Sequence, residues 1–487
     1  TATSDRGGGA GPVGTPVMVH WQALLAVAVI LIAPPAPSAA RLRQLRPGIR
    51  RSPTGGPRLS SLQTSSFQLP KRVPMTTRRS PTPRPSPPID SHKLHCLVPD
   101  ISLDSASGTC DMFQRITLDL APFRAQGGID LASQREALFA EDQYLKRKVL
   151  FRIRGNGTEL TTHLPRFTEM REPHRKKLVA STLGLLADVA SAAGGLPDVE
   201  FVLSYGDRPS RPKREGLLPQ VNLAGEGVER FKPLPILSFS KTVDHYDILF
   251  PNTDYPTFKR GMLGGGNGGV PWRHKFQRAF WRGSTAGSPY WLRGGERPQL
   301  APRFAIVDAA KKAPELIDAG ITENLIKKAY VPAAAYFKAK HKKAKRVPFT
   351  QHDRWAYLLV VDGIGYSGRF RNLMTGSSAV FRLNVHPNGA PALFEHWHGG
   401  LVAYKHVVPV QVHNLAAHVM WGRGNPEELQ KLAAAGREHT EAALSRTATV
   451  CYVKRLLTEL AGTLKYSVGG SVGWENRGGG VTEKNDR

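Results

Sequence analysis

One stretch of the chain constrains the fold more than any other: residues 360–382, VVDGIGYSGRFRNLMTGSSAVFR. An apolar run meets an aspartate and a loop with three glycines, then two arginines, a short helical stretch and a second apolar run. Strand, glycine loop, helix and strand is the order in which many α/β proteins hold a phosphate. The lysine of a P-loop is missing here, and arginines stand at the far end of the loop instead. The stretch predicts an α/β sheet with an anion site at a strand end.

The rest of the globular region alternates in the same way. An amphipathic stretch at 171–195 predicts a helix that ends at a glycine pair, and Phe201 to Tyr205 predicts a buried strand directly after it. A further short strand is expected at 234–240. Repeated alternation of strands and helices favours α/β layers with parallel sheets. Two such clusters, 111–235 and 236–465, predict two Rossmann-like domains that face each other across a cleft.

The charge of the chain does not point to nucleic acid. The net charge is +28, but residues 41–93 hold twelve Lys/Arg against one Asp and so supply +11 of it. That segment is rich in Pro and Ser and lacks an apolar period, so we interpret residues 41–110 as a disordered basic stem. In the remainder, basic residues are not interleaved with aromatics and no nucleic-acid signature is present. We therefore expect no nucleic-acid partner.

The N-terminal segment resembles a targeting signal. Within 18–40 an apolar core of eleven residues runs from Ala23 to Ala33, too short to cross a bilayer comfortably but suited to a signal peptide. We expect residues 1–40 to be a signal peptide or an anchor, with Met18 as the true start and 1–17 as a gene-model artefact. A short buried helix of a cytosolic protein is the alternative. Membrane contact is expected only through this segment, and the polar tail 466–487 is expected to be flexible.

Three cysteines are too few for a disulfide framework. Cys96 and Cys110 could pair across a short loop, and Cys451 is expected to be a small core residue of the C-terminal helix. The sequon at 156–158 also fits a secreted protein.

Three patterns that could carry chemistry are incomplete. Residues 365–369 nearly match the nucleophile elbow G-x-S-x-G, but the last glycine is Arg369 and no oxyanion-hole segment accompanies it, which disfavours a serine hydrolase. His396 and His398 could share a strand face and bind zinc, but no third ligand follows at a fixed spacing. Core or surface histidines are the favoured interpretation of this region, which holds His386, His396, His398, His406, His413 and His418. The basic run 328–346 is interpreted as a solvated face.

The strand-end loops carry a more complete set of groups. Ligands of open α/β sheets lie beyond the carboxyl ends of strands, and three such ends here hold Asp207, Arg282 with Ser284, and Ser367 with Arg369. Glycines let a backbone approach a bulky anion, and helix amides after the loop would add partial positive charge. Two arginines from different strands could clamp a pyrophosphate, since the guanidinium binds phosphate through a fixed fork. The alternative is an arginine paired with a core carboxylate.

Six motifs occur together in one order and cover about residues 111–465. They are DLAPFRAQGGID, LPDVEFVLSYGDRP, PILSFSKTVDHYDILFP, FQRAFWRGS, YLLVVDGIGYSGRFRNLMTGSSAVFR and HVVPV. In this the chain resembles glycosyltransferase family 90, the group of fungal capsule-associated proteins and animal protein O-glucosyltransferases. The resemblance implies a GT-B fold, a UDP-glucose or UDP-xylose donor, inversion at the anomeric carbon, and no metal. The sequence agrees in one respect: it contains no Asp-x-Asp, the motif that metal-dependent GT-A enzymes usually need.

The resemblance also assigns roles to residues. Asp207 would be the general base, and Arg282 and Arg369 would hold the donor diphosphate. Further donor-binding residues would be Gly283, Ser284, Thr285, Gly363, Gly365, Ser367, Ser240 and Lys241. One carboxylate to remove the acceptor proton and two cations for the leaving UDP form the minimum set for inverting transfer. No permanently bound cofactor is expected; the UDP-sugar is a substrate.

The expected activity is transfer of glucose or xylose from UDP to a hydroxyl of a protein (Ser/Thr) or a glycan, in the lumen of the Golgi or endoplasmic reticulum. One alternative is a xylosyltransferase that acts on polysaccharide, and another is a catalytically inactive family member that binds glycans. His245, Tyr246, His396 and His398 depart from the ring types usual in the family at these places. These departures leave the sugar and the acceptor open.

Overall fold

The structure is a computed structural model of the chain. It describes residues 94–140, 147–164, 173–213, 231–253, 263, 269–287, 297–326, 331–387 and 389–469. All of them lie in the second of two units, Thr1–Arg79 and Ser80–Arg487. The expected signal or anchor, most of the stem and most of the tail lie outside the described residues. In the part of the chain that is described, no helix combines the length and the apolar character needed to cross a membrane.

The first sheet is mixed and has the order β4-β3-β5-β6-β7. Its strands are β3 (Lys148–Arg154), β4 (Glu159–His163), β5 (Val199–Ser204), β6 (Ile236–Ser238) and β7 (Ile248–Leu249). The accompanying helices are α2 (Gln114–Ala125), α3 (Leu131–Phe139), α4 (Pro173–Ala192) and α10 (Arg446–Ala461). β3 runs antiparallel to both β4 and β5, whereas β5, β6 and β7 run parallel, so the expectation of parallel sheets is only partly right here. The strand expected at Phe201 to Tyr205 is present as β5, buried along its whole length.

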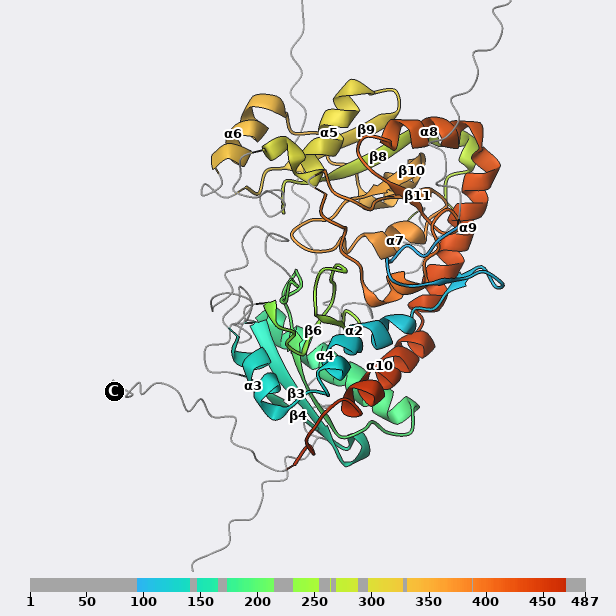
Figure 1. The fold of residues 1–487 in the computed structure, drawn as a ribbon. Helices are drawn as coiled ribbons and strands as arrows, with labels where there is room; N and C mark the ends of the chain where they lie inside the picture. The colour runs from blue at the N-terminus through green and yellow to red at the C-terminus, as the bar shows by residue number, and fades with distance from the viewer. Residues whose placement is uncertain are drawn as a thin grey trace, which may run out of the picture. The chain divides into compact units, whose positions relative to one another are not determined.

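The first sheet extends past the domain boundary expected at 235/236. β6 and β7 follow that position, but Leu237 of β6 pairs with Leu203 of β5, and Ile248 of β7 pairs with Leu237. The C-terminal helix α10 also returns to pack against α2 and α4 (Figure 1). Short apolar runs predict strands but do not specify which sheet each strand joins, because pairing depends on distant partners.

The second sheet is wholly parallel and has the order β12-β11-β10-β8-β9. Its strands are β8 (Phe276–Ser284), β9 (Ile317–Glu323), β10 (Trp355–Val360), β11 (Ala379–Leu383) and β12 (Val408–Val410). Its helices are α5 (Pro302–Lys312), α6 (Val331–Lys340), α7 (Phe370–Met374), α8 (Leu415–Gly424) and α9 (Pro426–Ala443). The described residues also include short 3-10 segments: η3 (Gly155–Gly157), η8 (Trp272–His274), η10 (Pro298–Leu300), η11 (Phe349–Arg354) and η12 (His396–Gly400).

The strand order places a switch point between β8 and β10. The chain passes from β8 through α5 to β9 on one side, and then returns to β10 on the other side of β8. Crossovers that leave neighbouring parallel strands in opposite directions open a crevice at the carboxyl ends of those strands. The carboxyl end of β10 leads into the glycine loop, and that of β8 carries Arg282 and Ser284. The fold therefore places two of the three predicted strand ends side by side.

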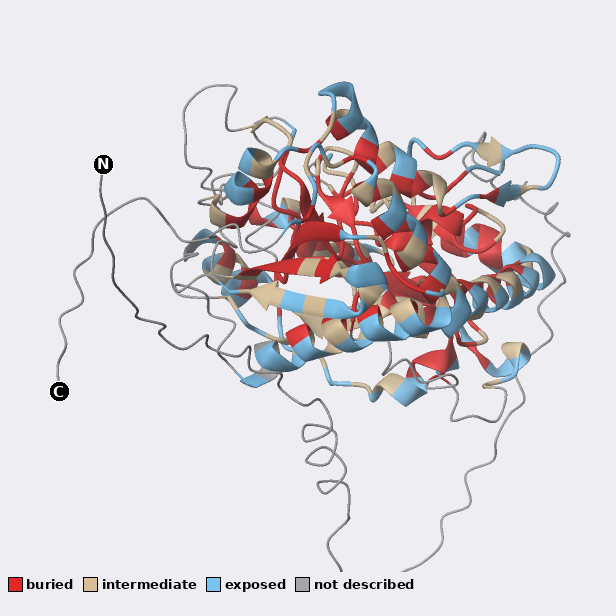
Figure 2. Cartoon of the chain, turned by 90° about the horizontal axis from the view of Figure 1, so that it is seen from below, coloured by how far each residue is buried: buried red, intermediate tan, exposed pale blue. Residues whose placement is uncertain are grey.

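The apolar core follows from the composition of the strands. β10, with the sequence WAYLLV, is buried at every position, as expected of a central parallel strand covered on both faces. Figure 2 shows buried residues concentrated on the strands and exposed residues on the outer faces of helices. The ring of Tyr452 on α10 stacks on Phe113 at a centroid distance of 6.1 Å and lies 4.9 Å from His396. The last helix thereby packs on groups from two regions distant in sequence.

The cysteines divide as follows. Cys96 and Cys110 form a disulfide beside the hairpin of β1 (Leu103–Asp104) and β2 (Thr109–Cys110), which confirms the expected pairing. Cys451, expected in the core, is exposed. The buried face of α10 includes Val450, Tyr452 and Val453, and Cys451 lies outside that face.

Candidate functional site

Two glycine-containing loops meet at the switch point. In the loop after β10 the amide of Gly363 donates to the carbonyl of Gly365 at 2.8 Å, which makes a tight turn. Gly287, in the loop after β8, has φ +84°, and a Cβ on it would lie 2.1 Å from the Gly363 carbonyl oxygen. A side chain at this position would clash with the turn and strain the backbone. The glycine at 287 thus allows the two loops to touch.

The same turn also receives a loop from the first sheet. A Cβ on Gly365 would lie 1.6 Å from the carbonyl oxygen of Asp207, which follows β5. Asn252, after β7, donates from Nδ2 to the hydroxyl of Tyr366 in the glycine loop. The structure therefore brings Asp207 and the glycine loop together, although β5 and β10 belong to different sheets.

The carboxylate of Asp207 is open to solvent. Its side chain is 61% exposed, and among the described residues it pairs with Arg147, with Nη1 3.9 Å from Oδ2. An exposed pair at that distance is weak, so Asp207 can exchange Arg147 for another hydrogen-bond partner at little cost.

The two predicted arginines are in contact through the side chain of Arg369. Its Nη1 donates to the backbone carbonyl of Arg282 at 2.6 Å. Burial of the guanidinium lowers the pKa of Arg369. Among the described residues, no carboxylate lies within ion-pair distance of Arg369. The described partner of the Arg369 guanidinium is thus the dipole of one backbone carbonyl, that of Arg282.

Arg282 is balanced differently. Its Nη2 donates to Oδ1 of Asp318 at 2.6 Å and its Nη1 to the carbonyl of Asp318 at 2.9 Å. The guanidinium also lies over the ring of Phe280, with its central carbon 4.7 Å from the centroid. Arg282 pairs in register with Gly320 of β9, where a Cβ would lie at ordinary contact distance from the Arg282 side chain, 3.5 Å, but only 2.5 Å from Cβ of Ala344. Arg282 thus matches the alternative interpretation, an arginine paired with a carboxylate, because Asp318 holds it in place and partly neutralises its charge.

A third arginine, Arg303, was not predicted from the sequence. It lies in the first turn of α5, and its Nε donates to the carbonyl of Asp362 at 3.0 Å while its Nη1 donates to that of Ser284 at 2.9 Å. Burial and, second, the charge of Arg369 lower the pKa of Arg303 to about 10. The available signal was its position, just inside the first helix after the Arg282 strand.

The remaining predicted donor residues have mixed surroundings. The Ser284 hydroxyl accepts from the Ala286 amide at 3.2 Å, and the buried hydroxyl of Thr285 accepts from the Leu325 amide at 2.7 Å. Ser284, the last residue of β8, and Thr285, which follows it, therefore shape the start of the loop after β8. Gly283 lies in β8 between Arg282 and Ser284. The Ser367 carbonyl accepts from the first amide of α7, at Phe370, at 2.8 Å. Since α7 has five residues, its dipole adds little charge at the loop.

Ser240 and Lys241 are not grouped with the arginines by any described contact. Lys241 is 2% exposed, its Nζ lies 2.8 Å from Oδ1 of Asp119 in α2, and it donates to the carbonyl of Asp247. Burial lowers the pKa of Lys241, while Asp119 opposes that shift. Ser240 is buried next to it in the chain. This ion pair ties the segment after β6 to α2.

The histidines belong mainly to the core. His396 and His398 are buried in the 3-10 turn η12, so the suggestion that they could share a strand face was wrong. Burial lowers the pKa of His396 to about 3. His386, His406 and His418 are also buried, whereas His413 is exposed, as the core-or-surface interpretation predicts. Within the described ranges, no group of three His, Cys, Asp or Glu side chains is arranged to hold a metal ion.

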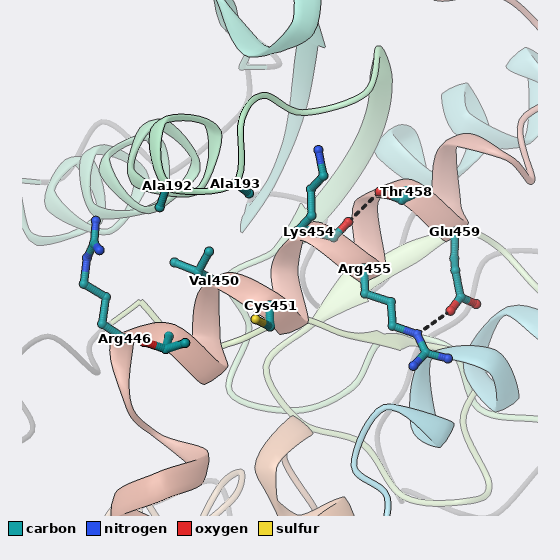
Figure 3. Close-up of a pocket in the computed structure, with 10 residues that line it drawn as sticks. Ala192, Ala193, Arg446, Val450, Cys451, Lys454, Arg455, Thr458 and Glu459 are labelled. Carbon is teal, nitrogen blue, oxygen red and sulfur yellow. Dashed lines mark hydrogen bonds and ion pairs between the residues drawn. The ribbon is translucent and has the colours of Figure 1, made fainter.

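A separate cavity of about 610 Å³ lies between the end of α4 and one face of α10 (Figure 3). Its charged side chains are largely paired within the protein: Arg446 with Asp188 at 3.0 Å and Arg455 with Glu459 at 2.9 Å. Cys451 also lines it. No predicted site residue contributes to this cavity, so it adds nothing to the arginine site.

Comparison with known proteins shows which family the sequence belongs to. The model of glycosyl transferase family 90 matches residues 105–475. The chain belongs to glycosyl transferase family 90. The resemblance carried by the six motifs is thereby confirmed.

Distant relatives within family 90 are named for O-glucosylation. The chain is 28% identical to human protein O-glucosyltransferase 3 over 280 residues, 55% of this chain and 47% of that protein. It is 25% identical to human protein O-glucosyltransferase 1 over 370 residues, 72% of this chain and 79% of that protein. It thus spans about half the length of the former. A solved domain, the C-terminal domain of glycosyl transferase group 1 family protein (LpcC) from Francisella tularensis, overlaps 38% of this chain and 92% of that domain at 12% identity. Its TM-score of 0.22 is too low to carry an argument.

Proposed function

We propose that this family 90 glycosyltransferase moves glucose or xylose from a UDP-sugar to a hydroxyl of a protein (Ser/Thr) or a glycan, with inversion and without a metal. The observation that carries the proposal is the contact of Arg369 with the Arg282 carbonyl at the switch point, on the same glycine turn that touches Asp207. Two arginines and a carboxylate-bearing residue beside one turn would supply what inverting transfer needs.

Arg369 and Arg282 would stabilise the departing diphosphate. Arg369 is a largely buried cation whose described hydrogen-bond partner is a neutral carbonyl. A diphosphate beside it would supply the compensating charge, and the interaction would strengthen as negative charge develops on the leaving group. Arg282, fixed by Asp318, would orient the carbonyl that holds Arg369 and offer its two remaining N–H groups. The GT-B arrangement of two domains is consistent with these roles and remains part of the proposal.

Asp207 would act as the general base. Its exposed carboxylate can accept the proton of an acceptor hydroxyl while that oxygen attacks the anomeric carbon. The sugar would pass through an oxocarbenium-like state between this carboxylate and the arginines, so that attack and departure occur on opposite faces.

The names of the relatives favour glucose as the sugar and a protein hydroxyl as the acceptor. The disulfide between Cys96 and Cys110 is suited to an oxidising compartment, which supports the lumen of the Golgi or endoplasmic reticulum. Transfer of xylose to polysaccharide by the same site is the alternative within this chemistry.

The test is release of UDP from UDP-glucose, UDP-xylose and UDP-galactose by the purified full chain without an acceptor. We expect slow hydrolysis of one or two donors, which would also identify the sugar. If UDP binds but no donor is hydrolysed, even when Ser/Thr peptides and glycans are added as acceptors, the chain is a catalytically inactive member of the family. If none is bound or hydrolysed, the proposal is wrong.

A further inference from the structure

We propose that Asn156 is a glycosylation site, at which an oligosaccharide becomes attached to the side-chain amide. The inference rests on one part of the proposed function, passage of the chain through the secretory lumen. It adds a modification that neither the motifs of the donor site nor the comparisons assign.

The sequence contains a single acceptor for this modification. Asn156, Gly157 and Thr158 form the pattern Asn-x-Ser/Thr with a residue other than proline in the middle. No other asparagine of the 487 residues has a serine or threonine two positions later. A glycan linked to this chain through nitrogen would therefore be attached at 156.

The turn between β3 and β4 presents this asparagine to solvent. Asn156 is the middle residue of η3 and is exposed. Its φ is +57°, and the glycines on either side have φ +58° and +90°. A left-handed backbone favours glycine and asparagine over most residues, so the conformation alone could account for an asparagine here. The surroundings of its side chain are therefore the deciding observation.

The side-chain amide of Asn156 does not hold the turn together. Among the described residues it has no hydrogen-bond partner, whereas the hydroxyl of Thr158 donates to the carbonyl of Gly155 at 2.8 Å and closes the turn. The amide lies beside the backbone of Gly195, where a Cβ would be 2.0 Å from Oδ1 and 2.4 Å from Nδ2. The glycine at 195 thus leaves room for the amide, and modification of Nδ2 would break no hydrogen bond of the described structure.

This turn lies at the opposite end of the first sheet from Asp207. β3 runs antiparallel to β5, and in their register Ile153 pairs with Val199 and Lys148 with Ser204. The turn follows the end of β3 that meets the first residue of β5, whereas Asp207 follows the last. The six residues of β5 span about 17 Å, at roughly 3.3 Å per residue. A glycan on the turn would therefore begin away from the proposed transfer site.

The attachment is a transfer of sugar to nitrogen. The donor is an oligosaccharide joined through C1 of its first sugar to a lipid diphosphate. Nδ2 of Asn156 forms a bond to C1 and loses one proton, while the bond from C1 to the diphosphate oxygen breaks and the lipid diphosphate leaves with the electron pair. A lumenal membrane enzyme catalyses this step and recognises the hydroxyl of Thr158 as part of the pattern.

The test is the mass of the full chain, purified from a eukaryotic secretory host, before and after digestion with an N-glycosidase. Asn156→Asp removes the acceptor but keeps a residue that tolerates positive φ. Thr158→Ala and Thr158→Ser remove and keep the hydroxyl, and Thr161→Ala is the control, an exposed threonine of β4 with no asparagine two positions before it. Thiol labelling of Cys96 and Cys110 shows whether the chain reached an oxidising lumen.

We expect digestion to remove one glycan from the wild type, Thr158→Ser and Thr161→Ala, and to leave Asn156→Asp and Thr158→Ala unchanged. The UDP affinity of Asn156→Asp should equal that of the wild type. An oxidised chain without a glycan, or a glycan that persists in Asn156→Asp, would overturn the inference. Reduced cysteines and no glycan would overturn it together with the proposed compartment. A glycosylated wild-type chain that does not bind UDP would support the inference and refute the proposed function.

Discussion

Arg369 and Arg282 share a hydrogen bond but differ in how their charges are balanced. Arg282 has Asp318 as its counterion, whereas Arg369 contacts the Arg282 carbonyl without a described carboxylate partner. A buried cation that lacks a counterion is unfavourable unless a ligand supplies one. This difference between the two side chains supports the proposal that Arg369 binds the diphosphate and that Arg282 orients Arg369.

Asp207→Asn should separate binding from transfer. The amide keeps the size of the side chain but cannot accept a proton, so we expect transfer to fall by about 10²-fold or more with UDP affinity unchanged. Initial rates with the preferred UDP-sugar and UDP calorimetry measure the two effects. Asp198→Asn is the control, because Asp198 is also exposed but stands before β5 instead of after it. Unchanged turnover in Asp207→Asn would remove Asp207 from the mechanism.

The sequence predicted residue types at strand ends better than it predicted their partners. Asp207, Arg282 and Arg369 all follow or end strands, and the loops that carry them contact one turn. Carboxyl ends of strands are where α/β folds bind ligands, so residue type and position were enough to select them. The pairing of Arg282 with Asp318 depends on the register of β8 and β9, which the sequence does not show. Likewise Lys241 pairs with Asp119 across 122 residues. Such long-range ion pairs need the fold to be known.

At the scale of elements, the order of strands creates the site. The apolar runs predicted strands at β5 and β10, but only the order β12-β11-β10-β8-β9 reveals that β8 and β10 flank a switch point. The sequence also did not predict where the first sheet ends. β6 and β7 have only three and two residues, and such short apolar runs do not indicate which sheet they join.

Gly287→Ala tests whether contact between the two loops matters. The new Cβ would meet the Gly363 carbonyl, so we expect loss of stability and weaker UDP binding. Gly389→Ala is the control, because Gly389 has φ +82°, close to the +84° of Gly287, yet nothing lies within 4 Å of its Cβ position. It should show the backbone strain alone, about 1–2 kcal/mol in urea unfolding, with normal UDP affinity. Equal effects of both substitutions on stability and binding would contradict the account of the loop contact.

At the scale of the whole molecule, buried neutral histidines should make stability depend on pH. Burial lowers the pKa of His245 and His396 to about 3 and that of His352 and His439 to about 4, below the ordinary 6.5. The unfolded chain therefore binds more protons than the folded chain below pH 6.5. Stability is complete above that pH and is lost as the pH falls towards 4.

Urea unfolding at pH 7, 6 and 5 measures this dependence. We expect the free energy of unfolding to fall with pH by about 1–2 kcal/mol per buried histidine between pH 6.5 and 5. His396→Phe should reduce the slope, and the exposed His413→Gln should leave it unchanged. A free energy that is constant from pH 7 to 5 would contradict the burial of these rings in neutral form.

We propose that the switch point of the second sheet holds a diphosphate through Arg369. Calorimetric titration of UDP into the wild-type chain and Arg369→Ala, with Arg423→Ala as control, tests it most directly. Arg423 also donates to a backbone carbonyl, that of Gln277 at 2.9 Å, but near the opposite end of β8. The account predicts that Arg369→Ala weakens UDP binding by about 1.5–3 kcal/mol, the contribution of a charged hydrogen-bond partner, while Arg423→Ala binds as the wild type does. Equal UDP affinity in the wild type and Arg369→Ala would contradict it.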